Sequence, residues 1–224
     1  PVITSTLSRT LAAKEFVRNR WENPEPIFGV DRFDSGSVEY LGATMNRFSP
    51  AKSIKFGIGF LPESRKDQGI IPARSLSENI SLPHLSALSC FGWINKSAER
   101  GLVNKFFAMC GIKAASAQVH ISTLSGGNQQ KVIVAREFSR NVRLVIAAQP
   151  TRGLDVGSIE YIHRRIVEQR DAGAAVLIVS TELDEVLALG DRVAVMYEGR
   201  IVGILDAKEA TRERVGLLMG GITK

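Results

Sequence analysis

The sequence predicts an α/β fold, with a mostly parallel sheet, flanking helices and an inserted helical lobe. Residues 144–148 and 175–180 are short apolar runs of the kind that form buried strands. An amphipathic segment lies between them and ends at Gly173, a typical helix stop. Strand and helix alternating in this way are typical of parallel sheets with helices on their faces.

The last hundred residues give the clearest order of elements. A helix is predicted to follow Ser125-Gly126-Gly127 and to run to about Arg140, and a turn at Glu198-Gly199 joins the final two strands. The predicted elements are a strand at 144–148, a helix at 159–172, a strand at 175–180, a helix at 183–189, and strands at 193–197 and 200–205.

The first half of the chain contains shorter elements. The predictions are a helix at 11–18, a strand at 37–41, a helix at 50–55, a buried strand at 57–61, a turn or helix at 77–80, and a helix at 98–110. Residues 63–124 therefore form a helical lobe set between two pieces of the α/β core.

Composition restricts the class of protein. The chain has 224 residues, of which 44% are hydrophobic and 23% charged, as in ordinary globular domains. No apolar run approaches the roughly 18–20 residues that span a bilayer, and the first residues lack a signal-peptide pattern. We expect a cytoplasmic protein, with a peripheral membrane role left open. Cys90 and Cys110 lack metal-ligand spacing and are expected to be buried or free thiols.

The net charge of +6 raises the question of nucleic-acid binding. The basic residues are spread along the chain and mixed with acidic ones, and aromatic residues are few. A solvated surface explains this distribution better, so no nucleic-acid partner is expected.

Residues 124–130, with the sequence LSGGNQQ, form the first candidate site. A serine and two glycines before a helix leave backbone N–H groups unpaired at its positive end, which attracts anions. Glycine also lets a phosphate approach the backbone closely. The alternative is a plain helix cap, since serine is a common N-cap.

Residues 144–155, with the sequence LVIAAQPTRGLD, form the second candidate site. A buried strand that ends in polar residues is where α/β proteins place ligands. The two motifs together resemble the nucleotide-binding domain of ABC transporters, in which LSGG is the signature motif. The strand then resembles Walker B, and Gly153-Leu154-Asp155 the D-loop. Residues 179–185 occupy the switch-histidine region.

A narrower resemblance comes from residues 58–66, with the sequence IGFLPESRK. They are similar to the Q-loop of the second, C-terminal nucleotide-binding domain in importers of simple sugars and nucleosides. Glu63 stands at the position of the Q-loop glutamine. The run 147–157 is similar to the nucleoside branch in particular. The resemblance covers residues 28–210 and implies an ABC-type P-loop NTPase core.

The phosphate loop of such ATPases needs Gly-x-x-x-x-Gly-Lys-Ser/Thr. The first glycine of this sequence is Gly29, and no Gly-Lys pair occurs. We therefore expect the phosphate loop to be absent and the core to be incomplete at the N-terminus.

Three positions that resemble the catalytic core carry unusual residues. Ala148 replaces the magnesium-coordinating aspartate, so no metal ligand is expected there. Gln149 replaces the catalytic glutamate, and an amide can orient water but cannot accept its proton. Thr181 replaces the switch histidine. The resemblance implies that this chain alone hydrolyses ATP weakly or not at all.

The intact signature motif implies a role toward a partner. In the family, each ATP lies between the core of one domain and the signature of the other. The expected partners are a second ABC nucleotide-binding domain, which shares ATP and Mg²⁺, and membrane permease subunits that dock near residues 63–100. The protein would then lie at the cytoplasmic face of the membrane. The expected ATP-binding residues are Ser125, Gly126, Gly127, Asn128, Gln129, Glu63 and Asp155.

Residues 1–26 match no part of the family pattern, and residues 27–224 form the expected ATP-binding domain. We expect a fragment or a reading-frame change in the first segment, against the alternative of a native extension. Two other functions stay open: a non-catalytic module that only dimerises, and a soluble ABC-type protein that acts on nucleic acid.

Overall fold

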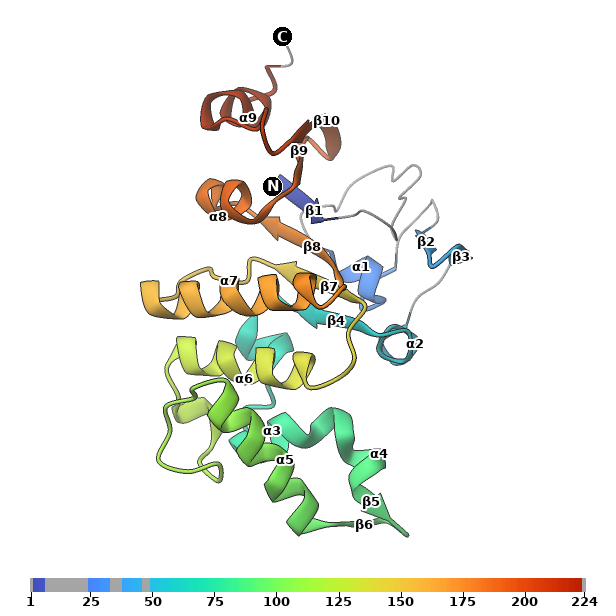
Figure 1. Cartoon of the computed structure of the whole chain (residues 1–224), viewed down its shortest axis with the longest axis vertical. Helices are drawn as coiled ribbons and strands as arrows, with labels where there is room; N and C mark the ends of the chain where they lie inside the picture. The colour runs from blue at the N-terminus through green and yellow to red at the C-terminus, as the bar shows by residue number, and fades with distance from the viewer. Residues whose placement is uncertain (1, 7–23, 33–37, 46–48, 223–224) are drawn as a thin grey trace. The chain divides into compact units, whose positions relative to one another are not determined.

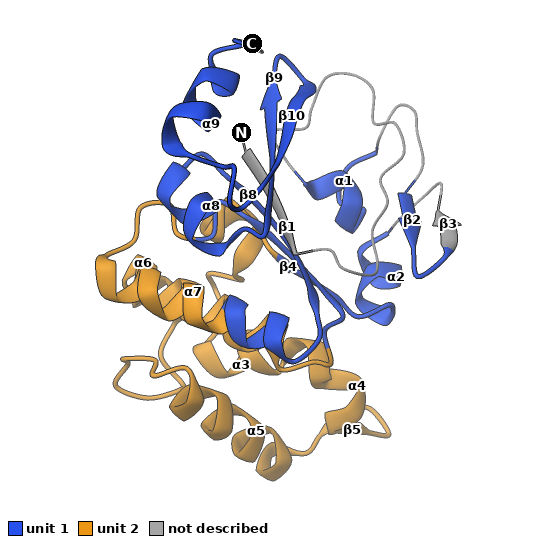
Figure 2. Ribbon diagram, turned by 45° about the horizontal axis from the view of Figure 1, so that its top comes forward, with its two compact units in different colours: residues 1–60, 142–150, 166–224 blue, residues 61–141, 151–165 orange. Residues whose placement is uncertain are grey.

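The structure is a computed structural model that describes residues 2–6, 24–32, 38–45 and 49–222. The helix predicted at residues 11–18 lies outside these ranges. The chain divides into two compact units, coloured separately in Figure 2. The first unit contains residues 1–60, 142–150 and 166–224, and the second contains residues 61–141 and 151–165. Helix α7 (Val156–Asp171) begins in the second unit and ends in the first.

A six-stranded sheet forms the first unit (Figure 1). Its strands, in spatial order, are β10 (Arg200–Asp206), β9 (Arg192–Tyr197), β1 (Val2–Thr6), β8 (Ala175–Ser180), β7 (Leu144–Ala148) and β4 (Ile58–Leu61). β7 and β8 pair in parallel, with Leu144 opposite Ala175 and Ala148 opposite Val179. Every residue of both strands is buried, which explains why their sequences are continuous apolar runs.

Strand β1 was not predicted from the sequence. It pairs antiparallel with β8 on one side and antiparallel with β9 on the other. The segment that matches no part of the family pattern therefore supplies an interior strand of the sheet. β9 and β10 form the predicted antiparallel hairpin.

The core of the first unit lies around β4, β7 and β8. Phe28, from the short helix α1 (Glu25–Phe28), stacks on Phe60 with ring centroids 5.0 Å apart. The Ser53 hydroxyl donates to the Phe28 carbonyl at 2.7 Å and so fixes α2 (Pro50–Lys55). Pro50 occupies the first turn of α2, where a missing N–H costs nothing.

The remaining elements of the first unit are short. Helix α8 (Leu183–Leu189) packs against β8, and α9 (Arg212–Met219) packs against β9. Strands β2 (Val38–Tyr40) and β3 (Ala43–Met45) form a hairpin. The sequence predicted the first strand of this hairpin and missed α9.

The second unit is the predicted helical lobe together with the signature helix. Its elements are η1 (Arg65–Gly69), α3 (Leu76–Ser81), η2 (Leu82–His84), α4 (Leu85–Leu88), β5 (Ser89–Cys90), β6 (Trp93–Ile94), α5 (Lys96–Met109), η3 (Ile121–Thr123) and α6 (Gly126–Phe138). Helix α3 packs against both α5 and α6. None of the helices in the described ranges is long and apolar enough to cross a bilayer.

Candidate functional site

The predicted site residues fall into two groups, one in each unit. Ala148, Gln149 and Thr181 lie in the first unit, at the ends of β7 and β8. The signature residues, Glu63 and Asp155 lie in the second unit. One group therefore belongs to the sheet, and the other belongs to the unit that contains the lobe.

Ala148 is part of the apolar core. Its side chain is 2% exposed and belongs to a buried cluster with Ile146, Leu177 and Phe60. A methyl group among aliphatic and aromatic neighbours offers no ligand to a cation, and these residues do not fit a magnesium ion.

Gln149 and Thr181 bond to each other. The Gln149 side-chain oxygen accepts hydrogen bonds from the Thr181 backbone N–H and from the Thr181 hydroxyl, both at 3.2 Å. The Gln149 N–H donates to the Val179 carbonyl at 2.8 Å, which continues the β7–β8 ladder by one residue. The two residues that the sequence analysis expected at the catalytic-glutamate and switch-histidine positions are therefore joined through a neutral amide.

The backbone at Gln149 is in the left-handed region, with φ at 46°. This conformation is uncommon for a residue with a side chain, and such strain occurs often at functional sites. The side chain is buried, so the two bonds from Thr181 satisfy an oxygen that would otherwise be costly to bury.

The signature motif opens α6, as predicted. Ser125 is the N-cap in an extended conformation, but its side chain makes no capping bond to the helix backbone. Ser75, by contrast, accepts a bond from the N–H three residues into α3. The first N–H groups of α6 therefore lack a side-chain cap, and the helix end retains its attraction for an anion.

Gly127 is constrained by a close neighbour. A Cβ atom at this position would lie 2.2 Å from the Ser158 hydroxyl and 3.0 Å from an Asp155 carboxylate oxygen. Only glycine allows the start of α6 to approach the start of α7 this closely.

Asp155 is held by Ser158. One carboxylate oxygen accepts from the Ser158 N–H at 2.9 Å, and the other accepts from the Ser158 hydroxyl at 2.7 Å. The hydroxyl and then the N–H lower the pKa of Asp155 from its usual value. Asp155 is therefore an ionised, exposed group in a fixed position beside Gly127.

Asn128 and Gln129 brace the turn before α6. Asn128 donates to the Ser125 hydroxyl at 3.0 Å and accepts from the Lys113 N–H at 2.9 Å. The buried Gln129 amide donates to the Leu124 carbonyl at 3.1 Å and to the Ile121 carbonyl at 3.3 Å. The side chain of Gln129 is thus engaged with its own chain, although the sequence grouped it with ATP-binding residues.

Glu63 pairs with an arginine that the sequence motifs did not single out. Its carboxylate accepts from the Arg152 guanidinium in an ion pair. The Arg65 guanidinium donates to the Arg152 carbonyl at 2.8 Å. Burial lowers the pKa of Arg65 from its ordinary value. These residues are 87 and 89 positions apart, so no local pattern could reveal their pairing.

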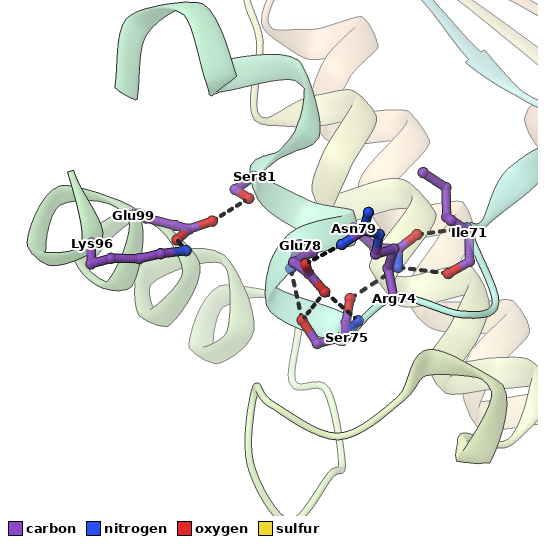
Figure 3. Close-up of polar contacts among 8 residues, drawn as sticks. All are labelled: Ile71, Arg74, Ser75, Glu78, Asn79, Ser81, Lys96 and Glu99. Atoms are coloured by element: carbon purple, nitrogen blue, oxygen red, sulfur yellow. Dashed lines mark hydrogen bonds and ion pairs between the residues drawn. The ribbon is translucent and has the colours of Figure 1, made fainter. Parts of the chain in front are cut away.

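A polar network fixes the loop before α3 (Figure 3). The fully buried Asn79 accepts from the Ile71 N–H at 2.8 Å and donates to the carbonyls of Ile71 and Ser75 at 3.2 and 2.9 Å. Ser75 and Glu78 form a reciprocal capping box. Residues 71–75 are consequently held as one rigid segment of the lobe.

Comparison with known proteins gives one consistent result. The family described as ABC transporter matches residues 25–152. The chain is 40% identical over 202 residues to the guanosine import ATP-binding protein NupO of Bacillus subtilis, covering 89% of this chain and 40% of the relative. It is 41% identical to the ribose import ATP-binding protein RbsA of the same organism, covering 90% of this chain and 41% of the relative.

A third relative is the nucleoside import ATP-binding protein NupA of Lactococcus lactis, at 40% identity, with 87% of this chain and 39% of the relative covered. The chain thus spans about two fifths of the length of the curated relatives that it matches.

Solved structures agree with the predicted fold. The ATP-binding cassette MJ1267 has a TM-score of 0.72 at 20% identity, covering 89% of this chain and 81% of that one. The dimeric cassette MJ0796, bound to ADP and Pi, has a TM-score of 0.69 at 18% identity, covering 92% and 98%. At these identities the likeness shows the fold alone, and it confirms the predicted α/β cassette with its inserted lobe.

Proposed function

Because this chain belongs to the ABC transporter family, we propose that it is part of an importer that couples ATP hydrolysis to uptake of a simple sugar or nucleoside. Its relatives at about 40% identity are import ATP-binding proteins for guanosine, ribose and nucleosides. Within that assembly, the chain supplies its signature helix to the ATP site of a second nucleotide-binding domain.

The observation that carries the proposal is the start of α6. Its N-terminus has no side-chain cap, Gly127 has no room for a side chain, and Asp155 is fixed beside it. ATP held on the partner's core would place its anionic phosphates against such a helix end, where backbone N–H groups and the helix dipole stabilise negative charge.

The residues that fit this role are those that face away from their own unit. Ser125 is exposed, and Gly126 and Asn128 are partly exposed, so their polar groups are accessible to a ligand held by another domain. ATP supplies the phosphoanhydride bond that is hydrolysed. This chain stabilises the negative charge of the phosphates and helps to position them, and the partner's residues would hold Mg²⁺.

The core of this chain does not fit the same chemistry. Ala148 offers no ligand to magnesium, and the Gln149 amide cannot remove a proton from water. Its oxygen is already bonded to Thr181. We therefore assign one hydrolytic site and one inactive site to each pair of domains.

The lobe is the proposed contact with the membrane permease. Several large apolar side chains of the second unit are exposed between residues 63 and 100, namely Ile71, Leu82, Phe91 and Trp93. Phe91 is fully exposed at a tight turn where its φ is 50°, so a strained backbone presents an aromatic ring to solvent. This surface would keep the protein at the cytoplasmic face of the membrane.

The test is ATP hydrolysis by this chain mixed with the first nucleotide-binding domain of an importer of this family. We expect stimulation by the wild-type chain and a loss of about 100-fold for Ser125→Arg, since removing oxyanion donors costs roughly 100- to 1,000-fold. Ser122→Arg adds the same side chain to an exposed residue outside the motif and should behave as wild type. Equal stimulation by all three proteins, or none by the wild type, would refute the proposal.

The second candidate is a non-catalytic module that only dimerises. The neutral Gln149–Thr181 contact favours it for this chain in isolation. Titration of the chain with Mg-ATP separates the possibilities. Dimerisation with the partner domain without any change in its hydrolysis would support the module alone.

A further inference from the structure

The signature turn, the D-loop and the Q-loop segment meet at one side chain in the second unit. The Arg65 guanidinium donates to the carbonyl of Arg152 at 2.8 Å. Its second terminal nitrogen lies 3.5 Å from the point where a Cβ of Gly126 would stand, and 3.9 Å from the corresponding point of Gly153. Arg65 therefore touches two segments that are distant from it in sequence.

In a second bond, Arg152 is the donor instead of the acceptor. Arg152 extends its guanidinium to the Glu63 carboxylate, so residues 63 and 65 each bind Arg152, one through its side chain and one through its backbone. The two bonds form a clasp that consists of Glu63, Arg65 and Arg152. Both bonds join residues 63–65 to Arg152.

The clasp is continuous with the signature helix. A Cβ of Gly126 would stand 3.5 Å from the Arg65 guanidinium and 3.9 Å from a methyl group of Leu154. A Cβ of Gly127 would stand 2.2 Å from the Ser158 hydroxyl and 3.0 Å from an Asp155 carboxylate oxygen. The first turn of α6 thus packs against residues 153–158. The clasp holds Arg152, the residue that precedes this segment.

We propose that Arg65 is a positioning residue that couples the segment after β4 to the start of α6 through the carbonyl of Arg152. This inference rests on the proposed function, in which that segment faces the permease and α6 faces the partner's ATP. When the permease holds residues 63–65, the clasp sets the D-loop and signature turn in the position that supports hydrolysis.

The chemistry of the clasp requires arginine. Its planar guanidinium presents several N–H groups in a fixed fork, so one nitrogen can bind the carbonyl while another lies beside Gly126. Lysine would carry the charge but only a single nitrogen. Methionine would keep most of the apolar stem and lose both the charge and the hydrogen bond.

The experiment measures ATP hydrolysis by the complete importer in liposomes and by the same nucleotide-binding protein without its permease. The variants are Arg65→Met, Arg65→Lys and a control, Arg212→Met, which removes an arginine from the exposed Arg212–Asp184 pair of the first unit. For Arg65→Met we expect about a tenfold lower kcat with the permease, an unchanged KM for ATP, and an unchanged rate without the permease. Arg65→Lys should recover part of the permease-dependent rate, and Arg212→Met should match wild type.

Three results would overturn the coupling role. If Arg65→Met lowers the rates with and without the permease by the same factor, Arg65 has a structural role only. The same conclusion follows if Arg65→Met raises the KM for ATP and lowers the Tm. Wild-type behaviour of Arg65→Met would show that the clasp is dispensable.

A Ser125→Arg sample in the same assay separates this inference from the proposed function. If Ser125→Arg abolishes hydrolysis and Arg65→Met does not change it, only the clasp is refuted. If Ser125→Arg has no effect, the proposed function fails and the clasp fails with it.

Discussion

Single residues decide which chemistry this chain can perform. Gly127 can approach Ser158 only because it lacks a side chain, and the Gln149 amide forms a neutral bond with the Thr181 hydroxyl. The start of α6 lacks a side-chain cap and keeps its attraction for an anion, while Ala148 lies in an apolar cluster and offers no ligand to a cation.

Burial of Ala148 leads to a prediction about pH. Ala148→Asp would place a carboxylate among apolar side chains, which costs several kcal/mol when it is charged. Burial raises the pKa of such a carboxyl in the folded state, so folding should weaken as pH rises above about 4, the pKa of aspartate in the unfolded chain.

Urea unfolding at pH 4 and pH 7 measures this effect. The control is Ala148→Asn, because asparagine has the shape of aspartate but does not ionise. Its effect on the free energy of unfolding should be nearly the same at both pH values. An Asp variant that is as stable as the Asn variant at pH 7 would mean that the site accepts a charge.

At the scale of elements, sequence patterns gave the most accurate bounds for short segments with a uniform pattern. β7, β8 and α8 have the predicted bounds, because a continuous apolar run or a regular helical period needs no distant partner. β1 was missed because its sequence, Val-Ile-Thr-Ser-Thr, is short and mostly polar, and only its pairing with β8 and β9 makes it a strand.

The same limit applied to the candidate site. Ser125, Gly126 and Gly127 could be recognised as an anion-binding helix start because the signal is local. Arg65, Arg152 and Ser158 could not, because their roles arise from contacts between segments far apart in sequence.

The polar network of α3 yields a prediction at the element scale. Asn79 makes three hydrogen bonds to the backbone of residues 71–75 from a fully buried position. Asn79→Leu keeps the size of the side chain and removes all three, so we expect a loss of about 2–4 kcal/mol in the free energy of unfolding.

Arg74→Ala is the matched control for this prediction. It removes an exposed pair with Glu78 on the same segment and should cost less than about 1 kcal/mol. Chemical denaturation measures both variants. A cost for Asn79→Leu that is no larger than the cost for Arg74→Ala would show that the network does not hold the loop.

At the scale of the whole molecule, the two units contain different groups of candidate residues. The first unit contains the sheet and a core that does not fit magnesium, and the second contains the lobe, the signature helix and the clasp. The chain spans about two fifths of the length of its curated relatives.

The most direct test of asymmetric hydrolysis is the number of ATP molecules cleaved in the first turnover of each assembly. Rapid quenching of the complete importer, saturated with Mg-ATP, gives this number as the amplitude of the ADP burst. One ADP per assembly is predicted, because in the proposed function only the partner's core, completed by Ser125, Gly126 and Gly127, hydrolyses ATP. A burst of two ADP per assembly would show that the core of this chain is active and would contradict the account.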